Sequence, residues 1–157
     1  MRLETILRAQ VVRHPDKMAL ICDGERLCYR ELGMRIARVA SGLEAAGIKP
    51  GDRIVLFLSN GPAVVELFYA AFSLGAIVVP VTTRLTAHEL RHICADSAPA
   101  AIVYEGSGEA IGEVLQANPH AVRITLGPPA LGAVAYDALR QSEAAPLPAL
   151  SLHSDDA

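Results

Sequence analysis

The chain has 157 residues, of which 52% are hydrophobic and 20% are charged, and its formal net charge at pH 7 is −3. This length and composition are typical of one globular domain with its own core, and they lie outside the range of disordered proteins. Charges of both signs are interspersed without a basic stripe, so we expect no nucleic-acid partner.

The sequence contains no apolar run of the roughly 20 residues that a membrane-spanning helix requires, and Glu66 interrupts a long apolar stretch. We therefore expect no transmembrane segment. The first residues carry charges and show no signal-peptide pattern, which favours a cytoplasmic protein. Cys22, Cys28 and Cys94 lack the paired spacing of a zinc site or a redox pair, which indicates reduced cysteines with a packing role.

The N-terminal part is predicted to form a helix and a hairpin. Apolar residues at helical spacing predict a helix over residues 3–13, which His14 and Pro15 terminate. Two short strand-like runs, 19–22 and 26–29, flank a turn that contains Asp-Gly, a pair that readily adopts the positive φ of a tight turn.

Residues 29–126 are predicted to alternate between helices and parallel strands. The predicted helices cover residues 29–46, 62–74, 87–96 and 109–117, and the predicted strands cover residues 54–58, 76–81, 101–104 and 121–126. Thr86 and Glu89 have the spacing of a capping box at the start of one helix. This alternation predicts an α/β fold of three layers, with a mostly parallel sheet and helices on both faces.

Beyond residue 126 the periodicity fades. Residues 136–140 could form one or two helical turns, whereas the Ala- and Pro-rich stretch that follows is typical of a linker. We therefore predict an α/β domain over residues 1–141 and a linker over residues 142–157.

Three segments resemble the adenylate-forming (AMP-binding) superfamily, which includes acyl-CoA synthetases. Residues 27–32, Leu-Cys-Tyr-Arg-Glu-Leu, are similar to a family motif Leu-(Ser/Thr)-Tyr-x-Glu-Leu, with Cys28 where a hydroxyl residue is usual. Residues 42–54 resemble the family's turn from a long helix into a buried strand, and residues 73–97 resemble its second core motif and the helix after it. The resemblance implies a flavodoxin- or Rossmann-like N-terminal subdomain of an acyl-CoA synthetase.

Such ligases work in two steps, in which a carboxylate attacks the α-phosphate of ATP and a CoA thiol then displaces AMP. The resemblance therefore implies ATP, Mg²⁺ and CoA for a full-length parent, with a carboxylic acid as its substrate. The chain contains neither a Ser/Thr/Gly-rich loop ending in Pro-Lys-Gly nor the late catalytic lysine of the family, since its only lysines are Lys17 and Lys49. We therefore assign no catalytic residue, no metal ligand and no cofactor to the chain itself, and we expect an inactive N-terminal fragment.

Arg84 is the candidate binding residue. It follows a predicted strand, where open α/β sheets place their ligand crevice, and the resemblance suggests contact with a CoA phosphate. Thr82 and Thr83 stand where the family usually has an Asn-x pair, so a solvated or ion-paired arginine is the alternative.

Other chemistry-bearing residues have ordinary structural interpretations. His88 and His92 are spaced i, i+4 on a helix but lack a third metal ligand. Glu66 is expected at the rim of its apolar helix, because a buried carboxylate needs a partner. Tyr69 and Phe72 are expected to be core aromatics, with an acyl-pocket role as the alternative.

Two other functions remain open from the sequence. The chain could be a stand-alone flavodoxin-like domain that binds a nucleotide or a protein, or part of an adenylation enzyme whose acceptor is not CoA. If it belongs to a ligase, its partner is the remainder of that protein. The isolated chain would then expose apolar surface that the rest of the ligase normally covers, and this exposed surface would favour a homo-oligomer.

Overall fold

The computed structural model describes residues 3–106, 109–128 and 132–144. The helices are α1 (Leu3–Arg13), α2 (Tyr29–Ala45), α3 (Pro62–Ser73), α4 (Ala87–Ser97), α5 (Glu109–Ala117) and α6 (Tyr136–Arg140). The strands are β1 (Met18–Cys22), β2 (Glu25–Cys28), β3 (Arg53–Phe57), β4 (Ile77–Val81), β5 (Ala101–Tyr104), β6 (Val122–Thr125) and β7 (Val134–Ala135).

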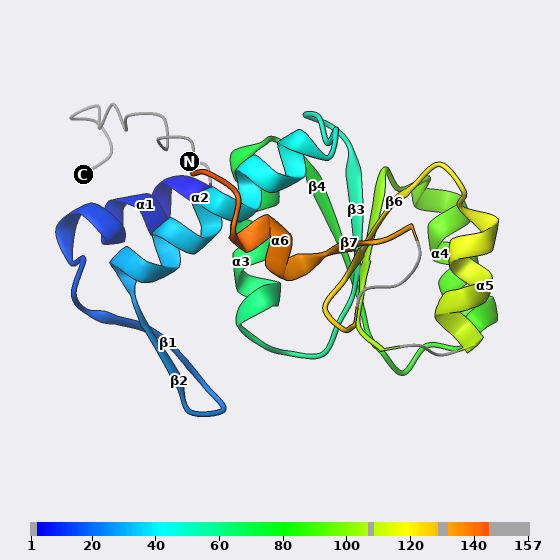
Figure 1. Cartoon of the computed structure of the whole chain (residues 1–157), viewed down its shortest axis with the longest axis horizontal. Helices are drawn as coiled ribbons and strands as arrows, with labels where there is room; N and C mark the ends of the chain where they lie inside the picture. Colours follow the sequence, from blue (N-terminus) through cyan, green and yellow to red (C-terminus); the bar gives the residue numbers. More distant parts are fainter. Residues whose placement is uncertain (1–2, 107–108, 129–131, 145–157) are drawn as a thin grey trace.

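Five strands form a parallel sheet with helices on both faces, as predicted (Figure 1). The strand order is β4-β3-β5-β6-β7. Helices α2, α3 and α6 cover one face, and α4 and α5 cover the other. Counted from β3, the order is 2-1-3-4-5, which is the flavodoxin-like order of doubly wound sheets.

Strand β3 connects the two hydrophobic cores because its side chains alternate between the faces of the sheet. Ile54 and Leu56 belong to the core under α2 and α3, whereas Val55 and Phe57 belong to the core under α4. All four side chains are buried. The uninterrupted apolar run is thus the pattern of a strand covered on both sides.

The hairpin β1–β2 lies outside the main sheet and projects beside α1 and α2 (Figure 1). Its turn residues Asp23 and Gly24 have φ values of 48° and 85°, as a type I′ turn requires. Leu27 on β2 is buried and joins the core next to α2. The predicted hairpin is therefore confirmed.

Helix α4 begins with the capping box expected from its sequence. The amide of Glu89 donates to Oγ1 of Thr86 over 3.3 Å, and the amide of Thr86 donates to Oε2 of Glu89 over 2.9 Å. These bonds satisfy amides that a helix start otherwise leaves unpaired.

The segment β7–α6 returns to the sheet after β6, and only its helix was expected. Strand β7 has two residues, which is too short to produce a periodic signal. Helix α6 approaches α2 at Gly42, where an added Cβ would lie 2.9 Å from Cα of Leu139. Apart from residues 142–144, the predicted linker 142–157 lies outside the described residues.

Among the residues that the structure describes, no helix is both long enough and apolar enough to cross a membrane.

Candidate functional site

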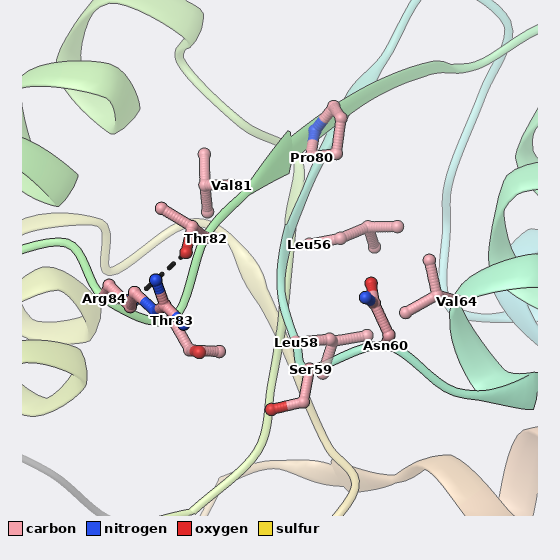
Figure 2. A pocket seen from close by; sticks show the side chains of 10 residues that line it. All are labelled: Leu56, Leu58, Ser59, Asn60, Val64, Pro80, Val81, Thr82, Thr83 and Arg84. Atoms are coloured by element: carbon pink, nitrogen blue, oxygen red, sulfur yellow. Dashed lines mark hydrogen bonds between the residues drawn. The ribbon is translucent and has the colours of Figure 1, made fainter.

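A pocket of about 460 Å³ opens at the carboxyl ends of β3 and β4 (Figure 2). This is the edge at which doubly wound sheets bind ligands. Its lining consists of Leu56, Leu58, Ser59, Asn60, Val64, Pro80, Val81, Thr82, Thr83 and Arg84.

The pocket has an apolar floor because β3 and the residue after its end contribute core residues to it. Leu56 and Leu58 are buried, and Val64 comes from the first turn of α3. Figure 2 shows Leu56 and Leu58 between the Thr82–Arg84 turn on one side and Asn60 and Val64 on the other. An apolar group of a ligand would be shielded from water here.

The rim of the pocket is polar because both strands end in loops. Ser59 and Asn60 follow β3, and Thr82, Thr83 and Arg84 follow β4; all five are exposed. Oγ1 of Thr82 accepts a 3.3 Å hydrogen bond from the backbone amide of Arg84 and holds this loop in a turn (Figure 2).

Among the described residues that line the pocket, Arg84 is the one that carries a charge. Within the described part of the chain its guanidinium makes neither an ion pair nor a hydrogen bond to another side chain, so the ion-paired alternative has no support there. The guanidinium has five N–H donors, which suit a phosphate or carboxylate. The pocket therefore combines an apolar floor with one cation, as an anionic ligand with an apolar part would require.

The sequence interpretation missed Ser59 and Asn60 as pocket residues. The available signal was their position directly after a buried strand, at the ligand-binding edge of a parallel sheet.

Glu66 is buried, contrary to the expected rim position. Its side chain is 1% exposed and interacts with residues from two other helices. Oε2 accepts a 2.6 Å hydrogen bond from the Tyr136 hydroxyl and lies 3.6 Å from Nε of Arg140, and Oε1 lies 3.3 Å from Nη1 of Arg35. The prediction failed because these partners are distant in sequence and become adjacent only in the folded chain.

The remaining candidates do not form a second site. His88 and His92 are exposed on α4, and the described residues include no group of three or more metal-ligating side chains. Tyr69 and Phe72 are half-buried on α3, with ring centroids 6.3 Å apart. Cys94 is buried in the core under α4, whereas Cys22 and Cys28 are half-buried and free.

The fold and the pocket define a doubly wound α/β domain with its ligand site at the carboxyl edge of the sheet. A family model described as AMP-binding enzyme matches residues 7–156. The chain therefore belongs to the family of AMP-binding, adenylate-forming ligases.

Named relatives agree with this assignment. The chain is 41% identical over 90 residues to a feruloyl-CoA synthase from Amycolatopsis, a match that covers 57% of this chain and 18% of that protein. It is 33% identical over 113 residues to the fatty acid–[acyl-carrier-protein] ligase ScoC of Streptomyces coeruleorubidus, covering 72% of this chain and 22% of ScoC. The chain thus spans about a fifth of the length of these relatives.

A solved structure has the same fold. The N-terminal domain of FACL13 from Mycobacterium tuberculosis, solved with a bound inhibitor, superposes with a TM-score of 0.77 at 28% sequence identity. The match covers 96% of this chain and 38% of that one. The three-layer fold of this chain is therefore also present in the N-terminal domain of FACL13.

Proposed function

We propose that the chain is the N-terminal α/β part of an ATP-dependent carboxylic acid:CoA ligase. The whole enzyme would form an acyl-adenylate from the acid and ATP, with Mg²⁺ bound to the phosphates, and would then transfer the acyl group to the CoA thiol. The single observation that supports this proposal best is the family match over residues 7–156, and relatives named as CoA ligases favour CoA as the acceptor.

Residues 1–157 alone should not catalyse adenylate formation. The family's phosphate-binding loop and catalytic lysine have no counterpart in this sequence, so nothing in it would stabilise the charge that develops on the α-phosphate. The test is acid-dependent exchange of pyrophosphate into ATP, in which the full-length ligase exchanges label and residues 1–157 do not. Exchange by residues 1–157 would refute this part of the proposal.

Arg84 is proposed to bind a CoA phosphate at the rim of the pocket. Charged hydrogen bonds contribute about 1.5–3 kcal/mol, so in the full-length ligase Arg84→Ala should raise the KM for CoA roughly 10- to 100-fold. Pyrophosphate exchange precedes CoA binding and should keep its rate. Arg26→Ala, an exposed arginine on the hairpin, is the matched control. An unchanged KM in Arg84→Ala would remove Arg84 from the CoA site.

A carrier-protein thiol is the second candidate acceptor, and the similarity to ScoC favours it. Thioester formation with CoA and with a phosphopantetheinylated carrier protein, compared in one assay, distinguishes the two acceptors. The third candidate, a stand-alone binding domain, predicts a stop codon directly after residue 157. A Ser/Thr/Gly-rich loop encoded there instead supports the ligase.

The proposed partners are the remainder of the ligase and, for the isolated chain, a second copy of itself. Strand β4 forms one edge of the sheet, and its Ile77 is 51% exposed. An apolar sheet edge favours association. A monomeric sedimentation profile at high concentration would contradict self-association.

A further inference from the structure

The sheet order alone allows two positions for the pocket, one on each side of β3. In a doubly wound sheet the crevice forms where neighbouring strands are followed by helices on opposite faces. Strand β3 meets this condition with both of its neighbours, β4 and β5, because α3 covers one face and α4 and α5 cover the other. The pocket lies between the ends of β3 and β4.

The carboxylate of Glu105 bridges the gap between β3 and β5. Glu105 is the first residue after β5, and its Oε1 accepts a 2.6 Å hydrogen bond from the backbone amide of Ser59. The ladder between these strands ends with the pair Phe57 and Tyr104. The carbonyl of Tyr104 accepts from Leu126 on the opposite side, over 2.9 Å. The hydrogen bond of the Ser59 amide is therefore accepted by the Glu105 side chain and not by a backbone carbonyl of β5.

We propose that Glu105 is a positioning residue for the pocket. By holding the Ser59 amide, it closes the crevice between β3 and β5 and fixes Ser59 and Asn60 as the wall of the pocket opposite Arg84. Its negative charge also disfavours an anion between β3 and β5 and so favours the side of the pocket that carries Arg84. The identity of the ligand as CoA rests on the proposed function, whereas the positioning of Ser59 does not.

Amide hydrogen exchange of Ser59, measured by NMR in residues 1–157, tests the positioning directly. Loss of a hydrogen bond to a charged acceptor in Glu105→Ala should speed exchange at Ser59 about 10- to 100-fold, while the Leu56 amide inside β3 keeps its protection. Glu105→Gln retains an acceptor oxygen and should keep most of the protection. Glu105→Asp retains the charge but is one methylene shorter, so it should lose the protection as Glu105→Ala does.

Glu44→Ala is the matched control, because Glu44 is an exposed glutamate on α2 that does not line the pocket. It should leave exchange at Ser59 unchanged. Wild-type exchange at Ser59 in both Glu105→Ala and Glu105→Asp would overturn the proposal.

Titration with CoA measures the effect on the pocket. Glu105→Ala should weaken CoA binding about 5- to 10-fold, and Glu105→Gln should restore most of it. Full affinity in Glu105→Ala would overturn the role of Glu105 at the pocket. If the wild-type chain bound no CoA, the proposed ligand would be wrong, and the exchange at Ser59 would still decide whether Glu105 positions this loop.

Discussion

The hydroxyl of Tyr136 donates a 2.6 Å hydrogen bond to Oε2 of Glu66, a carboxylate that is almost completely buried. Tyr136 begins α6, and Glu66 lies in the middle of α3. Arg35 and Arg140 lie on either side of the same carboxylate and supply the positive charge that a buried anion requires. The cluster therefore attaches the last described helix to the body of the domain.

Tyr136→Phe should destabilise the domain by about 1.5–3 kcal/mol, because it removes a short hydrogen bond to a charged acceptor inside the core. Urea unfolding at pH 7 measures the change. The control is Tyr69→Phe, since the structure shows no hydrogen bond of the Tyr69 hydroxyl among the described residues, and its effect should stay below about 0.5 kcal/mol. Equal effects of the two substitutions would contradict a special role for Tyr136.

The same tyrosine should make the domain sensitive to alkaline pH. Burial raises the pKa of the Tyr136 hydroxyl well above its ordinary value, and the negative charge of Glu66 adds to the rise. Above pH of about 10 the unfolded chain loses this proton while the folded chain retains it, so the free energy of unfolding falls by about 1.4 kcal/mol per pH unit.

Urea unfolding at pH 9 and at pH 11 measures this loss. The wild-type protein should lose about 1.4 kcal/mol more between these values than Tyr136→Phe, because the other titrating groups are common to both proteins. Equal losses would show that Tyr136 ionises as freely in the folded state as in the unfolded state.

Local patterns predicted most of the fold. The apolar run at Ile54–Phe57 and the amphipathic helix from Tyr29 each carry their signal within a few neighbouring residues. The partners of Glu66 lie 31 and 70 positions away, and a pattern along the chain contains no information about such pairs. Likewise, the sequence placed Arg84 at the carboxyl edge of the sheet, where the pocket lies, but the contact between Glu105 and the Ser59 amide joins residues 46 positions apart and gives no local signal.

Gly42→Ala should displace α6 from α2. The added methyl group would lie 2.9 Å from both Cα and Cδ2 of Leu139, so a backbone must move. We expect a net loss of about 1–2 kcal/mol, even though alanine favours helices. Thermal unfolding measures the change.

Gly112→Ala provides the matched control for that substitution. Gly112 also lies inside a helix, α5, but a Cβ there meets no atom within 4 Å. Alanine should therefore stabilise the domain by up to about 1 kcal/mol. If Gly42→Ala stabilised the protein as Gly112→Ala should, the close contact between α2 and α6 would not exist in solution.

Cys28→Ser should stabilise the start of α2. Cys28 is the N-cap residue, with an extended backbone at φ −79° and ψ 168°, and its amide donates to Oε2 of Glu31 over 2.9 Å. That bond is one half of a capping box. The other half needs a side-chain acceptor for the amide of Glu31, and a hydroxyl oxygen accepts more strongly than a cysteine sulfur.

Serine should therefore add about 0.5–1 kcal/mol to the free energy of unfolding, as N-cap hydroxyls commonly do. Urea unfolding of Cys28→Ser measures the gain, with Cys22→Ser as the control, because Cys22 is a half-buried cysteine at the end of β1 and caps no helix. Cys22→Ser should be neutral or slightly destabilising. A loss of stability in Cys28→Ser would mean that packing of the Cys28 sulfur stabilises the domain more than a hydroxyl cap does. The hydroxyl residue that is usual in the family would then not be a stabilising feature in this chain.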